Sequence, residues 1–128
     1  MGSLLKKRIL LIDDHSPNLE NLTEILEMEG YQVFFSHNGE EGILLTKAQL
    51  PNLVISDIKL PGIDGFELIK QLKANPSTQQ IPILLLSAFS EKSMINKGLE
   101  LGAKGYLVKP FGMEEMLITV QKIITDIN

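Results

Sequence analysis

LVISD, residues 53–57, is a short apolar run that ends in a carboxylate, and the turn-forming pair Pro61-Gly62 follows shortly after it. A run of this kind predicts a strand that is buried on both faces, as in a parallel sheet. In open α/β sheets, ligands bind at the carboxyl ends of the strands, which is where Asp57 falls. Because a single Asp at a strand end is also a common turn residue, its meaning depends on what the other strands bring to the same edge.

The same apolar pattern recurs four more times, and a stretch with helical spacing follows each run. The other expected strands are 8–12 (running into the acidic pair 13–14), 31–35, 81–86 and 105–108. The expected helices begin at Ser16-Pro17, Asn38-Gly39, Asp64, Ser90-Glu91 and Met113, and the last one runs to Ile127. Five strand–helix repeats predict a doubly wound (βα)5 α/β fold, a flavodoxin-like three-layer sandwich with a parallel sheet of order 2-1-3-4-5.

Composition places the chain among ordinary single-domain globular proteins. It has 128 residues, 44% of them hydrophobic, with a net charge of −4 and no Cys. The charge argues against a nucleic-acid footprint, and the lack of Cys fits a cytoplasmic protein without disulfides. No apolar segment approaches the ~18 residues of a membrane span. We expect an N-terminal tail at 1–6, with Met1-Gly2-Ser3 typical of residues left by cloning, and one domain at 7–128.

Four of the five expected strands end in residues that carry chemistry. Strand 1 ends in Asp13-Asp14, strand 3 in Asp57, strand 4 in Ser87 and strand 5 in Lys109. In the predicted order these strands are consecutive neighbours about 4.8 Å apart. Three carboxylates, a hydroxyl and an ammonium are therefore expected at one edge of the sheet.

Three carboxylates packed together repel one another, by about 4 kcal/mol per pair at 4 Å and an effective dielectric near 20. Lys109 offsets part of this repulsion, and a hard divalent cation can offset more. An oxygen-only site suits Mg²⁺, with Mn²⁺ as a substitute. Without Cys, and with His15 and His37 expected to be ordinary surface residues, zinc is not expected.

A cation, a carboxylate, an ammonium and a hydroxyl are the parts of a phosphoryl-transfer site, where catalysis is mostly positioning and charge stabilisation. Carboxylates act as nucleophiles in aspartyl-phosphate chemistry. Asp57 is the best candidate for the nucleophile because it is central in the predicted sheet. The acidic pair lies on one side of it, and Ser87 and Lys109 lie on the other.

From about Lys7 to Ile127 the chain resembles the receiver domain of two-component response regulators, and it is similar to the chemotaxis regulators among them. The likeness rests on Asp13-Asp14, on Asp57 followed by 60–65 (LPGIDG), on Ser87-Ala88 and on 105–111 (GYLVKPF). It implies that Asp57 accepts a phosphoryl group from a histidine kinase or phosphotransfer protein and loses it again by slow autodephosphorylation. Mg²⁺ would be ligated by Asp14, Asp57 and the backbone carbonyl of Lys59, with Asp13 acting mainly through water.

The resemblance also implies a conformational switch. The Ser87 hydroxyl would move toward the phosphoryl group, and Tyr106 would turn inward into the vacated space. The Lys109-Pro110 peptide bond would be cis, and Lys59 and Phe89 would flank the phosphoryl group and tune its lifetime. The simpler reading of Tyr106 is a half-buried strand residue whose hydroxyl lies at the surface.

The last helix carries a core stripe and, opposite to it, Ile118. The stripe consists of Met113, Met116, Leu117, Val120, Ile123, Ile124 and Ile127. A single exposed Ile is unremarkable. The alternative is a contact with a downstream target or a second copy through the helix 4–strand 5–helix 5 face, where receivers often associate.

Three other functions share parts of this pattern. A flavodoxin-like cofactor binder would need a neutral phosphate-binding turn where Asp13-Asp14 stands, and a haloacid-dehalogenase-type phosphatase would need an acid in place of Lys59. A degenerate receiver that serves only as a protein-interaction module would lack Asp57, Lys109 or the acidic pair, and this chain has all of them. The output, the kinase, the oligomeric state and whether the chain stands alone are not determined by the sequence.

Overall fold

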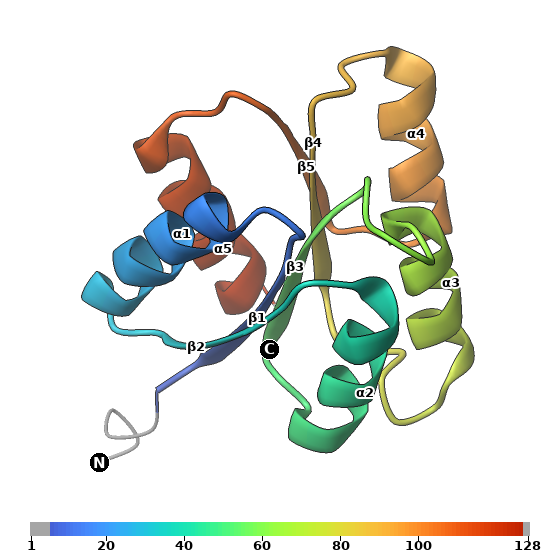
Figure 1. Cartoon of the computed structure of the whole chain (residues 1–128), viewed down its shortest axis with the longest axis horizontal. Coiled ribbons are helices and arrows are strands. Elements are labelled where there is room, and N and C mark those ends of the chain that lie inside the picture. Colours follow the sequence, from blue (N-terminus) through green and yellow to red (C-terminus); the bar gives the residue numbers. More distant parts are fainter. Residues whose placement is uncertain (1–5, 127–128) are drawn as a thin grey trace.

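Five strands and five helices alternate along the chain in the computed structural model, which describes residues 6–126 (Figure 1). The strands are β1 (Arg8–Ile12), β2 (Gln32–Ser36), β3 (Leu53–Asp57), β4 (Ile83–Ser87) and β5 (Gly105–Val108). The helices are α1 (Ser16–Met28), α2 (Gly39–Gln49), α3 (Gly65–Ala74), α4 (Lys92–Leu101) and α5 (Met113–Thr125). All strand pairs are parallel, in the order β2-β1-β3-β4-β5, so the predicted doubly wound fold is confirmed.

The sheet is buried on both faces because successive strand residues point to opposite sides. In β3, Leu53 and Ile55 join the core beneath α1 and α5, while Val54 joins the core beneath α2, α3 and α4. Figure 1 shows these two groups of helices on opposite sides of the sheet. The apolar run 53–57 is therefore the centre of both cores.

Capping residues fix where the helices begin. The side chains of Asn38 and Asp64 accept the N–H groups of Glu41 and Glu67 at 2.8 and 2.9 Å, as expected for N-caps. Ser16 was expected to be the N-cap of α1, which is wrong by one residue, because the N-cap is His15 and Ser16 is the first helical residue. The N–H of His15 donates to Asp13 Oδ1 at 2.8 Å, which sets the turn one residue earlier.

Two other boundaries differ from the sequence-based expectation. The fourth strand begins at Ile83 rather than Ile81, because the Ile81 N–H bonds to Thr78 in a preceding turn and Pro82 has no N–H. Met113, expected in the core stripe of α5, is 44% exposed because it is the first residue of the helix.

Met116, Val120 and Ile123 are buried as expected, and Ile118 is 59% exposed. Ile127 and Met1-Gly2-Ser3 lie outside the described residues. None of the helices within residues 6–126 has the length and apolar character needed to cross a bilayer.

Candidate functional site

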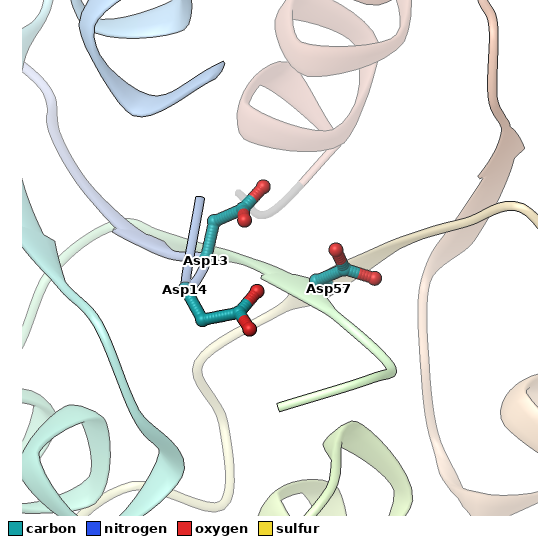
Figure 2. A group of neighbouring side chains, drawn as sticks. All are labelled: Asp13, Asp14 and Asp57. Carbon is teal, nitrogen blue, oxygen red and sulfur yellow. The ribbon is translucent and has the colours of Figure 1, made fainter. Parts of the chain in front are cut away.

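Three aspartates meet where β1 and β3 end. Asp13 and Asp14 follow β1 directly, and Asp57 is the last residue of β3. Figure 2 shows the carboxylates of Asp13 and Asp14 extending toward the side on which Asp57 lies, and one ligand oxygen from each of the three residues lies within 4.8 Å of the others. Within residues 6–126, these three aspartates form the cluster of side chains that could hold a metal ion, and neither His15 nor His37 belongs to it. The expected cluster of acids is confirmed.

Lys109 supplies the positive charge at this site. Its Nζ donates to Asp57 Oδ2 at 2.7 Å and lies 3.7 Å from Asp13 Oδ2. The main-chain N–H of Lys109 donates to the carbonyl of Ser87 at 2.8 Å, which ties the end of β5 to the end of β4. The Lys109-Pro110 peptide bond is cis, as the resemblance implied.

Asp13 is the buried member of the group, with 3% of its surface exposed. Its Oδ1 accepts the His15 N–H, while no described residue forms a hydrogen bond to its Oδ2. Burial raises the pKa of Asp13 above the ordinary value, the His15 hydrogen bond and the Lys109 charge oppose this rise, and the charges of Asp57 and Asp14 add to it. A buried carboxylate oxygen with no hydrogen bond is one that a cation or a water molecule can satisfy.

The raised pKa of Asp13 predicts a pH-dependent effect of Asp13→Asn. The carboxyl contributes stability that is fully present below the ordinary value of 3.8 and is lost as pH rises through the raised pKa. In EDTA at pH 7, Asp13→Asn should therefore raise the free energy of unfolding by about 1–3 kcal/mol, because it removes a buried charge and, to a smaller extent, the repulsion from Asp57 and Asp14. Thermal unfolding between pH 3.5 and 8, scanned at roughly unit steps, checks this.

The gain from Asp13→Asn should shrink toward zero at the acidic end of that range. Asp126→Asn, at the exposed end of α5, is the matched control and should show no such trend. A gain that is the same at every pH would contradict the assignment of the effect to Asp13 ionisation.

Ser87 and Tyr106 are linked through the main chain of Phe89. Ser87 is 1% exposed, and its Oγ accepts the Phe89 N–H at 3.0 Å. The Tyr106 hydroxyl donates to the Phe89 carbonyl at 2.8 Å. The N–H and the carbonyl of Phe89, shortly after β4, are thus bonded to Ser87 and Tyr106, the two residues expected to form the switch. Sequence reasoning missed this link, because a main-chain acceptor leaves no residue-type signal.

Gly65 has a packing role that its place in the stretch 60–65 did not indicate. A Cβ on this residue would lie 2.7 Å from the carbonyl oxygen of Asp57 and 2.8 Å from the Cα of Ile58. These neighbours are main-chain atoms and cannot move aside, so only glycine lets α3 begin directly against the end of β3. The available signal was the Asp64-Gly65 pair at the helix start.

Lys59 contributes its backbone to the site. Its N–H lies 3.4 Å from Asp57 Oδ1, and its side chain is exposed. The Phe89 ring is 39% exposed. Whether these two side chains tune a phosphoryl lifetime, and whether the Lys59 carbonyl ligates a cation, stay predictions.

Residues 9–121 match the family model described as the response regulator receiver domain. The chain is a receiver domain. It therefore belongs to two-component signalling, in which receiver domains in general are phosphorylatable switches.

Individual relatives agree with this assignment. The receiver domain is 33% identical over 117 residues to Protein PilH of Pseudomonas aeruginosa, covering 91% of this chain and 97% of that protein. It resembles the solved structure of the chemotaxis response regulator CheY4 of Vibrio cholerae with a TM-score of 0.88 and 28% identity, covering 93% of this chain and 99% of that one.

A longer relative bears on the partners. The phosphate regulon transcriptional regulatory protein PhoB of Pseudomonas aeruginosa is 34% identical over 121 residues, which are 94% of this chain and 53% of that protein. The receiver domain therefore spans about half the length of PhoB. The prediction that this chain binds no nucleic acid stays a prediction.

Proposed function

We propose that Asp57 accepts a phosphoryl group from the phosphohistidine of a histidine kinase or phosphotransfer protein. The observation that best supports this role is the position of Asp57 between the acidic pair and Lys109, whose Nζ lies 2.7 Å from Asp57 Oδ2. A carboxylate oxygen of Asp57 attacks phosphorus, the new O–P bond forms, and the N–P bond to the imidazole breaks. The leaving imidazole is protonated from water. Later attack by water on phosphorus releases inorganic phosphate and restores the carboxylate.

Lys109 makes this transfer electrostatically feasible. The acyl phosphate carries a charge of about −1.5 to −2 where the Asp57 carboxylate carried a single charge, so the site gains up to about one negative charge beside Asp13 and Asp14. The Lys109 Nζ lies 2.7 Å from Asp57 Oδ2 and 3.7 Å from Asp13 Oδ2. It can therefore stabilise the negative charge first on the Asp57 carboxylate and then on the phosphoryl oxygens. Ser87 Oγ, at the neighbouring strand end, is a second polar group for those oxygens.

The carboxylates fit a Mg²⁺ ion, for which Mn²⁺ would substitute. The donor set is oxygen only, and the Asp13 Oδ2 atom has no hydrogen bond within the described residues. We infer that Asp14, Asp57 and the Lys59 carbonyl would hold the ion and that Asp13 would act through water. When bound, Mg²⁺ supplies Lewis-acid neutralisation of phosphoryl charge.

The switch would run through Ser87, Phe89 and Tyr106. If the Ser87 hydroxyl turns to donate to a phosphoryl oxygen, the oxygen that accepts the Phe89 N–H moves. The main chain of Phe89 would then shift, and the Tyr106 hydroxyl, which is bonded to the Phe89 carbonyl, would move with it. Moving a two-state equilibrium from 1:99 to 99:1 takes about 5.5 kcal/mol. Two or three charge-assisted hydrogen bonds of about 1.5–3 kcal/mol each supply that amount.

Two surfaces suit the partners. A hollow of about 510 Å³ between α1 and the start of α5 reaches Asp13 and Lys109, and it gives a phosphodonor an apolar approach to the site. On the α4–β5–α5 side, Leu99 of α4 and Ile118 of α5 are exposed and would serve a downstream target or a second copy. We propose a cytoplasmic protein that contacts neither membrane nor nucleic acid.

Transfer can be tested without the natural kinase. Acetyl phosphate with Mg²⁺ should add one phosphoryl group to the chain, read by intact mass, and EDTA should prevent this. Asp14→Asn should reduce the Mg²⁺ effect on the rate and also the rise in melting temperature that Mg²⁺ causes. At tenfold excess over Kd that rise corresponds to about 1.4 kcal/mol, or roughly 5 °C.

The control for this experiment is Asp126→Asn, which should keep both Mg²⁺ effects. A wild-type chain that gains no mass would favour a receiver that works only by contact. A mass gain of equal rate in EDTA would remove the cation from the proposal.

A further inference from the structure

Strand β2 forms an open edge of the sheet, on the side of β2 that faces away from β1. β2 is the last strand in the sheet order, so only β1 pairs with it in the described chain. The Gln32 N–H donates to Lys7, and the Ser36 carbonyl accepts the Asp13 N–H, which fixes the alternate residues that face β1. The main-chain groups of Val33 and Phe35 therefore point outward, toward the open edge.

This edge has no feature that prevents another strand from pairing with it. The sequence of β2, QVFFS, contains no charged residue and no proline, which are the usual means of blocking an edge strand. Phe35 is 52% exposed and lies beside a hollow of about 500 Å³ between β2 and α1. An open strand with an exposed aromatic ring is suited to the addition of an extended peptide.

The charges around the hollow indicate what kind of peptide fits. Glu20 and Glu24 of α1 line it together with Leu19, Thr23, Phe35 and His37. From Pro17 to Gly30 the chain has four Glu and no Lys, Arg or His. The Thr23 Oγ1 atom is buried and has no hydrogen-bond partner within the described residues. The hollow thus combines an apolar floor with acidic walls.

We propose that the β2 edge binds an extended basic segment of a partner protein, as a sixth strand. Its Lys side chains would lie on the α1 side, with their aliphatic stems across the Phe35 ring and their ammonium groups at Glu20 and Glu24. Its alternate apolar side chains would lie on the opposite face, beside the half-buried Phe34. A second copy of this chain fits less well, because two-fold pairing of β2 strands would place one acidic α1 against another.

A designed peptide tests this directly. The heptapeptide acetyl-Lys-Val-Lys-Leu-Lys-Val-Lys-amide, labelled with a fluorophore, should bind saturably in anisotropy titrations at low salt. The version with Glu in place of Lys should not bind. Phe35→Ala should weaken binding about tenfold or more, and Glu20→Gln with Glu24→Gln should weaken it roughly fivefold. Leu44→Ala, an exposed apolar position on α2, is the control and should have no effect.

Strand addition is separated from simple charge attraction by N-methylation. Only one of the two alternating sets of peptide N–H groups faces β2, so methylating that set should abolish binding and methylating the other should not. Equal effects of the two sets, or unchanged binding by the Phe35→Ala variant, would overturn the proposal. Dimerisation of the chain that Phe35→Ala abolishes would overturn it in favour of a second copy.

The Phe35→Ala variant also separates peptide binding at β2 from phosphorylation at Asp57. It should still take up one phosphoryl group from acetyl phosphate, because Phe35 lies outside the acidic cluster. A wild-type chain that takes up the phosphoryl group but does not bind the Lys peptide would reject the β2 proposal alone.

Discussion

Asp57→Asn will take up no phosphoryl group from acetyl phosphate and Mg²⁺. The amide is not a nucleophile for phosphorus at neutral pH, and no other described carboxylate combines strand-end placement with a 2.7 Å contact to Lys109. The expected effect is complete loss of the mass gain rather than a slower rate. Intact-mass measurement over a time course long enough to saturate the wild type checks it.

The variant must also be shown to fold. The Asp57 side chain is only partly buried and lies at the end of β3, so circular dichroism should match that of the wild type. Asp126→Asn, far from the site on α5, should be phosphorylated like the wild type. A full mass gain by Asp57→Asn would place the acceptor elsewhere and contradict the assignment.

Lys109→Met should have the second-largest effect. The substitution keeps the length and apolar stem of the side chain but removes the only ammonium within 4 Å of Asp57 and Asp13 in the described structure. Loss of one group that stabilises transition-state charge costs about 10²–10³ in rate. We therefore expect phosphorylation by acetyl phosphate to slow by about that factor, while Asp57 stays the acceptor.

Lys122→Met on α5 is the matched control, since it removes an ammonium remote from the acids. The rate is measured by intact mass at a fixed acetyl phosphate concentration, with Mg²⁺ in excess. A Lys109→Met rate within a factor of about two of the control would mean that Lys109 does not stabilise the transferring group.

The fold was predictable because its signals are local and repeated. The apolar run 53–57 ends in Asp57, the run 105–108 is followed directly by Lys109, and Asn38 and Asp64 are standard N-caps. Once the strands and the order 2-1-3-4-5 were in place, the meeting of Asp13, Asp14, Asp57 and Lys109 followed from the sheet itself. That is why the site was predicted together with the fold.

The parts that sequence reasoning missed depend on main-chain atoms or on small shifts. The Phe89 carbonyl that accepts the Tyr106 hydroxyl bond has no residue signature, and the contact of Gly65 with Asp57 needs coordinates. The N-cap of α1 is His15, one residue before the expected Ser16, and Met113 is exposed although the periodicity of α5 places it in the core stripe. Tyr106 is half-buried and its hydroxyl donates to the Phe89 carbonyl, while its inward turn on phosphorylation stays a prediction.

The most direct test of the central claim is to locate the phosphoryl group in the wild-type chain. After treatment with acetyl phosphate and Mg²⁺, the acyl phosphate can be trapped by borohydride reduction, which converts the modified aspartate to homoserine, and found by tandem mass spectrometry. We expect the change at Asp57 alone. Homoserine at Asp13, Asp14 or any other acid, with Asp57 unchanged, would contradict the proposal that the four strand ends form one phosphoryl-accepting site around Asp57.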